Sequence, residues 1–441
     1  MHGVLAASAV HPQLGDLFPL WSVLPFAAML LSIAILPLLA PGLWEHNRNK
    51  AILSFVLGAP VAIWTASLES TAVVHAAGEY LAFILLLGAL FVISGGIVVR
   101  GTLAGTPGLN MILLAIGAVL ASMIGTTGAS MLLVRPLLRA NSVRIRKAHV
   151  FIFFIFVVAN GGGLLTPMGD PPLFLGFLRG VPFTWTLRLW REWMFANGIL
   201  LILFYFVDST IFRREDLERP GDLDRVAVEH EVPISIAGKQ NFLYLAGVVA
   251  VLLLSGTLGL PAPVQDAGLL AMVALSWLTT PKPLRAENGF TWSPIVEVAA
   301  LFAGIFATMI PALAILNARG AALGLQHPWQ YFWASGVLSS FLDNAPTYLT
   351  FASAASGAVG TNAEDLGQLL LTDHGAALLA AVSLGSVLMG ANTYIGNGPN
   401  FMVKAIAEQA GVRMPGFFGY MAWSGAILIP LFAAITWVFL L

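Results

Sequence analysis

The sequence predicts an all-α polytopic membrane protein whose two halves form an inverted repeat. Of its 441 residues, 58% are hydrophobic and 10% are charged, whereas soluble domains carry about 25% charged residues. Apolar stretches of about 20 residues, long enough to cross a bilayer, recur along the chain. Polar residues, Gly and Pro interrupt further apolar segments at corresponding places in the two halves. The ten predicted spans lie at about 21–43, 51–67, 79–100, 149–179, 193–212, 242–258, 264–280, 294–316, 375–409 and 417–441.

Charge and cysteine content exclude several classes of protein. The net charge is −1, so no basic surface is expected that would attract nucleic acid. The chain has no Cys, which excludes disulfides, thiolate metal sites and iron–sulfur clusters. Its sequence contains no phosphate-binding GxxxxGKS or GxxxxGKT run, so ATP-driven transport by this chain alone is not expected. The expected partner is the lipid bilayer, and neither a cofactor nor an enzymatic activity is predicted.

Two apolar segments are interrupted in the middle and are predicted to be re-entrant hairpins. Segment 110–139 contains Gly125-Thr126-Thr127-Gly128, and segment 328–357 contains Asp343-Asn344-Ala345-Pro346. Each half is too short to cross a bilayer comfortably, and an irregular tip is tolerated at membrane depth only against protein or a water-filled cavity. The alternative is four short spans. Hairpins are favoured because the distribution of basic residues fits an orientation only with hairpins.

A charged linker separates the two halves. Residues 213–240 hold 12 of the 43 charged residues and are expected to be solvated, between a first repeat at 1–212 and a second at 241–441. With the N-terminus outside, 17 of the 21 Lys and Arg residues fall on the inner side. Such a bias predicts a bacterial inner-membrane protein with both termini periplasmic and the linker cytoplasmic.

Two spans are predicted to be discontinuous, at 160–172 and at 392–400. Residues 166–174 align with 393–401 at an offset of 227, with four identical positions. With five spans in each half, the second half enters the membrane from the opposite side. Paired discontinuous helices in inverted halves indicate a transport site near the bilayer midplane.

The polar positions carry the match between the halves. Asp170 aligns with Asn397, and Glu79 aligns with Glu297 at an offset of 218. The first hairpin tip, Thr126-Thr127, aligns with Asp343-Asn344 at an offset of 217. Glu79 and Glu297 lie near the ends of spans, so a part in proton movement and a structural pairing role both stay open.

Asp170 and Asp343 are the acids at helix breaks, and charged side chains at membrane depth are rare and commonly functional. Each is a candidate for binding a cation or exchanging a proton, against the alternative of a helix cap or a turn residue. Asn344 adds an amide oxygen beside Asp343, and hard cations prefer oxygen ligands. The sequence therefore suggests Na⁺ at Asp170, Asp343 and Asn344.

Neutral polar residues complete the candidate site. They lie at the first tip and beside the two breaks, where they could bind substrate or Na⁺ or simply pack helices together. This group consists of Thr126, Thr127, Asn160, Asn392, Thr393 and Asn397.

The run 125–130, the run 134–141 and the run from Asn160-Gly161-Gly162-Gly163 to Asp170 resemble the NhaD-type sodium/proton antiporters. These belong with arsenite, citrate and dicarboxylate carriers in the ion transporter superfamily. The resemblance implies a fixed scaffold, an elevator-like transport part that holds the hairpins and broken helices, and a homodimer. It also implies that the following residues bind Na⁺ or exchange protons: Asn160, Asp170, Asp343, Asn344, Asn392 and Thr393.

The leading hypothesis is a Na⁺ (or Li⁺)/H⁺ antiporter in which both ions compete for Asp170 and Asp343, so that Na⁺ and H⁺ are the transported ions. The alternative is a Na⁺- or H⁺-coupled symporter of a small carboxylate or other oxyanion. It rests on Thr126-Thr127, which stand where many NhaD-type proteins have Asp-Asn, because a tip without the acid leaves room for an anion.

Overall fold

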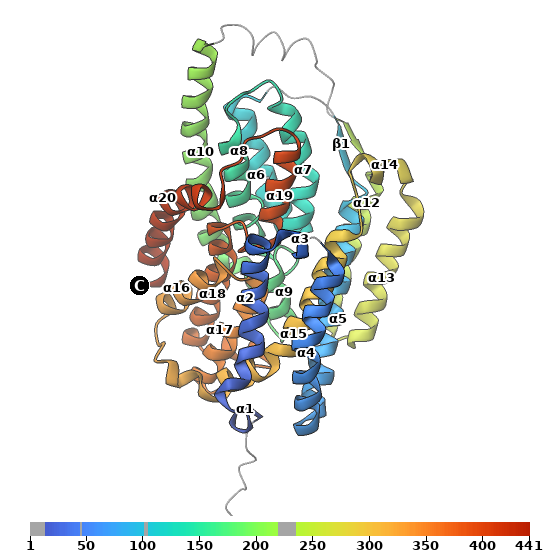
Figure 1. The fold of residues 1–441 in the computed structure, drawn as a ribbon, viewed down its shortest axis with the longest axis vertical. Coiled ribbons are helices and arrows are strands. Elements are labelled where there is room, and N and C mark those ends of the chain that lie inside the picture. The colour runs from blue at the N-terminus through green and yellow to red at the C-terminus, as the bar shows by residue number, and fades with distance from the viewer. Residues whose placement is uncertain (1–13, 45, 101–104, 219–234) are drawn as a thin grey trace, which may run out of the picture.

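A computed structural model describes residues 14–44, 46–100, 105–218 and 235–441, and the described chain is almost entirely helical (Figure 1). Ten helices are long and apolar enough to cross a membrane. The prediction of an all-α polytopic membrane protein is therefore confirmed.

The first half begins with short turns and then alternates long and interrupted helices. Its elements are α1 (Leu14–Leu17), η1 (Leu20–Val23), α2 (Leu24–Leu39), α3 (Pro41–Trp44), α4 (Asn47–Leu68), α5 (Ser70–Ser94), β1 (Val98–Arg100), α6 (Pro107–Ile124), α7 (Thr126–Ala140), α8 (Ala148–Val157), η2 (Gly161–Leu165), α9 (Pro171–Leu178), η3 (Trp185–Leu189) and α10 (Trp190–Glu218).

The second half follows a similar order of long helices, a helix pair and an interrupted helix. Its elements are β2 (Ser235–Ala237), α12 (Gln240–Leu258), α13 (Ala262–Thr279), α14 (Lys282–Glu287), α15 (Ser293–Arg319), η4 (Gly320–Leu323), α16 (Pro328–Ser339), α17 (Asn344–Val359), η5 (Leu366–Leu371), α18 (Asp373–Leu388), η6 (Met389–Asn392), α19 (Gly398–Gln409), α20 (Phe417–Ile435) and the π-helical turn η7 (Thr436–Leu440).

The helices separate at both predicted tips. Helix α6 ends at Ile124, Gly125 has φ 82°, and α7 begins at once and packs back along α6. That backbone conformation suits Gly because it has no Cβ. In the second half, α16 ends at Ser339 and α17 begins at Asn344. The ten apolar helices include α6, which the sequence assigns to a hairpin, and not α13, which the sequence predicts as a span.

The long helices also break where Gly and Pro predict it. In the first half, α8 ends at Val157 and α9 begins at Pro171, with Asp170 as N-cap (φ −144°, ψ 143°). In the second half, α19 begins at Gly398 with Asn397 as N-cap (φ −146°, ψ 137°). Asp170 and Asn397 thus have nearly the same backbone conformation. A Pro in the first turn of a helix needs no N–H partner, which explains why both helices start there.

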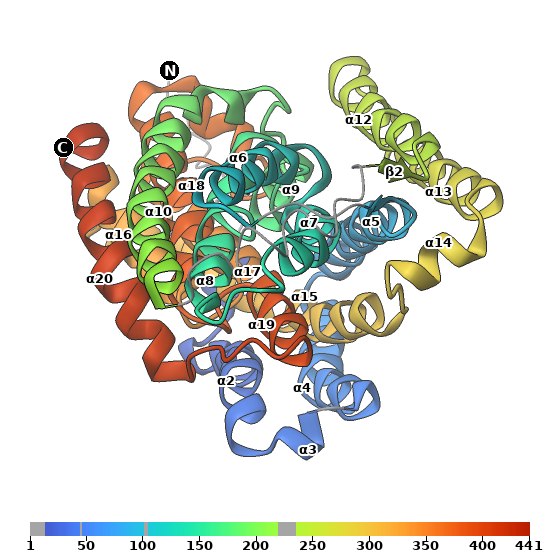
Figure 2. The same cartoon turned by 90° about the horizontal axis from the view of Figure 1, so that it is seen from above.

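The helices form two groups, seen from above in Figure 2. We call α2, α4, α5, α12, α13 and α15 the scaffold group, and α6–α10 with α16–α20 the hairpin group. Within the hairpin group, 89% of the apolar window over α8 and η2 and 78% of that over α18 and η6 is buried. In the scaffold group, only 22% of the window in α4 is buried. The interrupted helices are therefore surrounded by protein, as their free backbone groups require.

The structure corrects one boundary of the charged linker. Helix α10 continues to Glu218, and Glu215 is 1% exposed, whereas a solvated segment was predicted over 213–240. Glu215 is compensated because it accepts the backbone N–H of Ile145 and lies 3.8 Å from Arg144. The last linker residues form β2, which pairs antiparallel with β1. Residues 219–234 of the predicted linker lie outside the described residues.

Asp208 in α10 joins this buried polar cluster, and we expect its loss to destabilise the fold. It lies 2.6 Å from Arg144 and 2.8 Å from His149, and it accepts a hydrogen bond from Asn110. Asp208→Asn leaves Arg144 with only the more distant Glu215, so a loss of about 2 kcal/mol is expected. Thermal unfolding in detergent measures it, with Glu218→Gln as control.

That control is suitable because Glu218 pairs with Arg146 on the surface, where the side chains are 56% and 49% exposed. Surface ion pairs contribute about 0–1 kcal/mol. Equal melting temperatures for the two variants would contradict a stabilising role of Asp208.

Candidate functional site

The carboxylate of Asp170 lies where both tips and the second break meet. It is 1% exposed. Thr126 from the first tip donates its hydroxyl to Oδ1 (3.0 Å), and Asn344 from the second tip donates its amide to Oδ2 (2.9 Å). Asn397 donates to Oδ1 at 3.4 Å. Four predicted site residues from both halves therefore form one hydrogen-bonded cluster.

A chain of amides extends this cluster into the second break. Asn397 also donates to Oδ1 of Asn160 (3.2 Å), and Asn160 donates to Oδ1 of Asn400 (2.7 Å). Asn400 in turn donates to the backbone oxygens of Gly390 and Thr393. Sequence reasoning missed Asn400, although a lone Asn between apolar neighbours in a short half-helix is a signal that could have found it.

The second tip has a separate set of contacts. Asp343 is half-buried and caps α17 by accepting the N–H of Ala345 (3.0 Å). Among the described residues, no hydrogen bond joins Asp343 to Asp170. Asn392 donates to the hydroxyl of Ser340 (2.8 Å), and its own Oδ1 is buried with no hydrogen-bond partner among them.

The predicted Na⁺ ligands are therefore brought together only in part. Asn344 contacts Asp170, whereas Asp343 bonds to its own helix. Within the described residues, no three His, Cys, Asp or Glu side chains come close enough to hold a metal ion together. Na⁺ at this place would depend on neutral oxygens and backbone carbonyls as well as on carboxylates.

The tip of each hairpin contacts the break of its own half in the same way. Thr166 donates its hydroxyl to the backbone oxygen of Ser122, and Thr393 donates its hydroxyl to that of Ser340 (2.5 Å). The two threonines are 227 residues apart and the two serines 218. The contacts therefore repeat with the offset of the broken helices.

The contacts also place the tips in register with each other at 218 rather than at 217. A Cβ added to Gly163 would lie 2.7 Å from Cγ2 of Thr126, and one added to Gly390 would lie 2.8 Å from Nδ2 of Asn344. Thr126 thus corresponds to Asn344, and the sequence match that paired it with Asp343 is wrong by one residue.

Gly163→Ala is expected to disturb this packing. The new Cβ would also meet the backbone oxygen of Gly169 at 2.9 Å, and backbone cannot move aside cheaply. Overpacking of this kind destabilises by about 1–3 kcal/mol. Melting temperature in detergent and transport in liposomes measure the effect. Gly425→Ala, with no atom within 4 Å of the new Cβ, should leave both unchanged. A fully stable Gly163→Ala protein would contradict the close contact.

Thr127 faces away from the Asp170 cluster. It lines a cavity of about 70 Å³ between the first tip and the scaffold group. The tip side is formed by residues 124–128, 168, 169 and 171, and the scaffold side is apolar: Leu87, Leu90, Phe91, Pro294, Ile295 and Val298. The hydroxyl of Thr127 would therefore meet anything that passes between the tip and the scaffold.

Glu79 and Glu297 both lie in ion pairs away from Asp170. Glu79 in α5 is 5% exposed and binds Arg179 through two bonds of 2.6 and 2.8 Å. Glu297 in α15 is 37% exposed and lies 2.7 Å from Lys50 of α4. The pairing role that the sequence left open thus describes both acids, and a part in proton movement stays a prediction.

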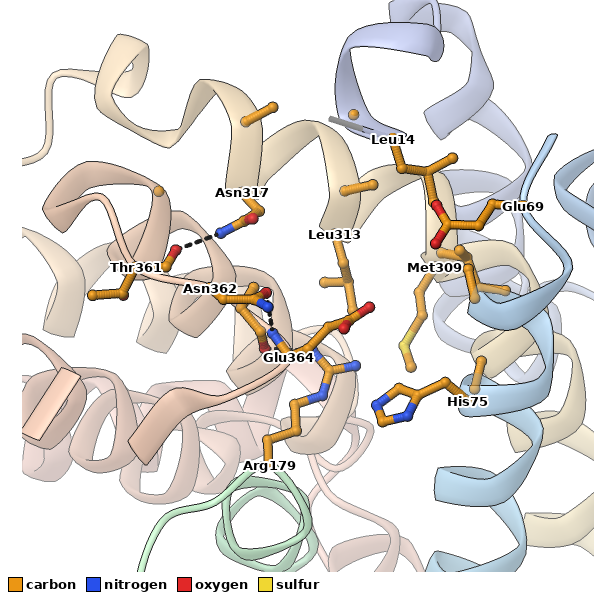
Figure 3. Close-up of a pocket in the computed structure, with 18 of the residues that line it drawn as sticks. Leu14, Glu69, His75, Arg179, Met309, Leu313, Asn317, Thr361, Asn362 and Glu364 are labelled. Carbon is orange, nitrogen blue, oxygen red and sulfur yellow. Dashed lines mark hydrogen bonds between the residues drawn. The ribbon is translucent and has the colours of Figure 1, made fainter. Parts of the chain in front are cut away.

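A larger cavity of about 610 Å³ lies beside the Glu79–Arg179 pair. Arg179, Glu364 and His75 reach it from three different segments of the chain (Figure 3). Glu69 and Asn362 also line it, so the cavity is polar, but Asp170 does not line it. It is an aqueous recess between the two groups of helices and is separate from the central cluster.

Comparison with known proteins identifies a family. A family model, CitMHS_2, described as "Putative citrate transport", matches residues 15–440. No curated protein sequence matches the chain. The match supports the superfamily of ion and citrate carriers, without singling out the NhaD-type antiporters, and with the ten apolar helices it indicates a multi-pass transporter rather than an enzyme. Because the match covers nearly the whole chain, the protein belongs to this citrate transport family.

Proposed function

We propose that the protein is a Na⁺- or H⁺-coupled transporter of citrate or another small carboxylate. One observation carries the proposal: the buried carboxylate of Asp170 is held by neutral donors from both hairpin tips and from the second break. The family, whose description is a citrate transport function, favours the carboxylate as the substrate.

The charge of Asp170 explains why transport would be coupled. Two unit charges about 4 Å apart repel each other by about 4 kcal/mol at an effective dielectric constant of about 20. A substrate carboxylate therefore enters beside Asp170 only after a proton or a metal cation has neutralised Asp170. Loading the cation first makes its movement a condition for movement of the anion.

The other site residues take roles around this carboxylate. Thr126, Asn344 and Asn397 donate to Asp170 while it is charged, and they become free to bind substrate oxygens once it is neutral. Asp343 provides a second carboxylate, at the second tip. Asn392 offers the unpartnered Oδ1, which suits a cation or a donor group. The following residues complete the proposed cation and substrate surface: Thr127, Asn160 and Thr393.

We further propose that transport follows an elevator mechanism in an inverted-repeat fold. The scaffold group stays in place, and the hairpin group, which holds Asp170, slides against it. The repeated tip-to-break contacts at offsets of 218 and 227 support the repeat. Termini on the periplasmic side of an inner membrane, a cytoplasmic linker and a homodimer belong to the same proposal.

Uptake by reconstituted liposomes tests the proposal. Radiolabelled citrate, malate and succinate are offered with an inward Na⁺ gradient, an inward H⁺ gradient or no gradient. We expect concentrative uptake of at least one carboxylate under one of the two gradients. Gradient-independent equilibration of all three, or no uptake of any, would contradict a coupled carboxylate transporter.

Na⁺/H⁺ antiport is a second candidate. It is favoured by the absence of a basic partner for Asp170 among the described residues, because an unneutralised carboxylate can bind either a proton or Na⁺. Antiport predicts that Na⁺ or Li⁺ added to acid-loaded liposomes raises the internal pH without any carboxylate present. A pH-sensitive dye inside the liposomes separates the two functions.

A further inference from the structure

The Glu79–Arg179 ion pair connects the two groups of helices. Glu79 belongs to α5 of the scaffold group, and Arg179 directly follows α9 of the hairpin group. The two side chains are 5% and 7% exposed, and Nε and Nη2 of the guanidinium bind the two carboxylate oxygens at 2.6 and 2.8 Å. Of the ion pairs formed within the described ranges, this one alone joins the two groups.

Arg179 is firmly attached on its own side. Its Nη1 donates to the backbone oxygen of Ala363 (3.2 Å), and its backbone oxygen accepts the N–H of Gly367 (3.3 Å). These residues follow α17, so Arg179 joins the end of the first broken helix to the segment after the second hairpin. A displacement of the hairpin group would carry the guanidinium with it.

The corresponding acid of the second half provides a contrast. Glu297 stands 218 residues after Glu79, and its partner Lys50 lies in α4, so both members of that pair belong to the scaffold group. Sliding of the hairpin group would separate Glu79 from Arg179 and would leave Glu297 and Lys50 together. The two halves therefore contain one pair that the motion breaks and one that it preserves.

We infer that the Glu79–Arg179 pair is a latch that holds the hairpin group in the position seen here and that opens in each transport cycle. The inference rests on the proposed elevator mechanism. The cavity of about 610 Å³ beside the pair lets water and the polar side chains of His75 and Glu364 solvate the separated charges. The latch can therefore open and close reversibly within the membrane.

The first test measures position without any substrate. Because the chain has no Cys, spin labels are attached at Ser70→Cys in α5 and Asp373→Cys in α18, both exposed in the structure. Double electron–electron resonance in nanodiscs should give one main distance. Removing both charges with Glu79→Gln and Arg179→Gln should add a second distance population, and Lys50→Gln with Glu297→Gln should not. An unchanged distribution in the Glu79/Arg179 variant overturns the latch.

The second test uses transport. A reducible bifunctional thiol crosslinker joins Glu79→Cys to Arg179→Cys, or Lys50→Cys to Glu297→Cys in a control protein. Crosslinking the first pair should stop uptake until reductant is added, and crosslinking the control pair should leave uptake unchanged. Full uptake by the crosslinked Glu79/Arg179 protein overturns the latch. If neither protein takes up any carboxylate before crosslinking, the proposed function fails, and the resonance measurement alone decides on the latch.

Discussion

Asp170→Asn is expected to reduce concentrative carboxylate uptake to the level of protein-free liposomes. The substitution keeps the size of the side chain and one acceptor oxygen for Thr126 or Asn344. It removes the charge that a proton or Na⁺ must neutralise before an anion can enter. Residual exchange of labelled for unlabelled substrate should therefore lose its dependence on pH and on Na⁺. Both quantities are measured in the same liposomes.

A matched control separates this effect from damage to the fold. Asp216 lies on the exposed side of α10, so Asp216→Asn should transport like the unmodified protein. Equal elution profiles and melting temperatures for the two variants would show that the loss concerns chemistry. Normal gradient-driven uptake by a folded Asp170→Asn protein would contradict the assignment of Asp170 and, with it, the coupling mechanism.

Local signals in the sequence located the interruptions of the helices well. Pro171 and Gly398 start half-helices in the structure, and Gly125 separates α6 from α7. Gly and Pro act on the backbone of their own segment, so their effect can be predicted without knowledge of the rest of the chain. The tip register was wrong by one residue because Thr126 and Asn344 share a position in the fold but little chemistry.

Contacts between distant segments could not be predicted in this way. Arg179 stands out in the sequence only as one of a few basic residues on the outer side, and nothing in its neighbourhood indicates Glu79, 100 residues earlier. Asn400 bonds to Asn160, 240 residues away. Polar side chains in apolar segments require partners, so the sequence shows that such residues are paired. Only the fold shows with which residue.

Glu79→Gln is expected to destabilise the protein strongly. It leaves the guanidinium of Arg179, 7% exposed, without its carboxylate. Breaking a buried ion pair by removing one partner costs about 3–5 kcal/mol, since the remaining charge is buried without compensation. Thermal unfolding in detergent or nanodiscs should show a large fall in melting temperature. Lys50→Gln should have a smaller effect, because its partner Glu297 is 37% exposed and is solvated when left alone.

The double variant distinguishes the cost of an unpaired charge from the value of the pair. With Glu79→Gln and Arg179→Gln together, no charge remains uncompensated, and the two amides can bond to each other. Replacing a buried ion pair by neutral groups is often close to neutral in stability. The double variant should therefore be more stable than Glu79→Gln alone, and a double-mutant cycle gives the coupling energy between the two side chains. Strictly additive losses would show that the two charges do not stabilise each other, in which case the pair could not hold the helix groups together.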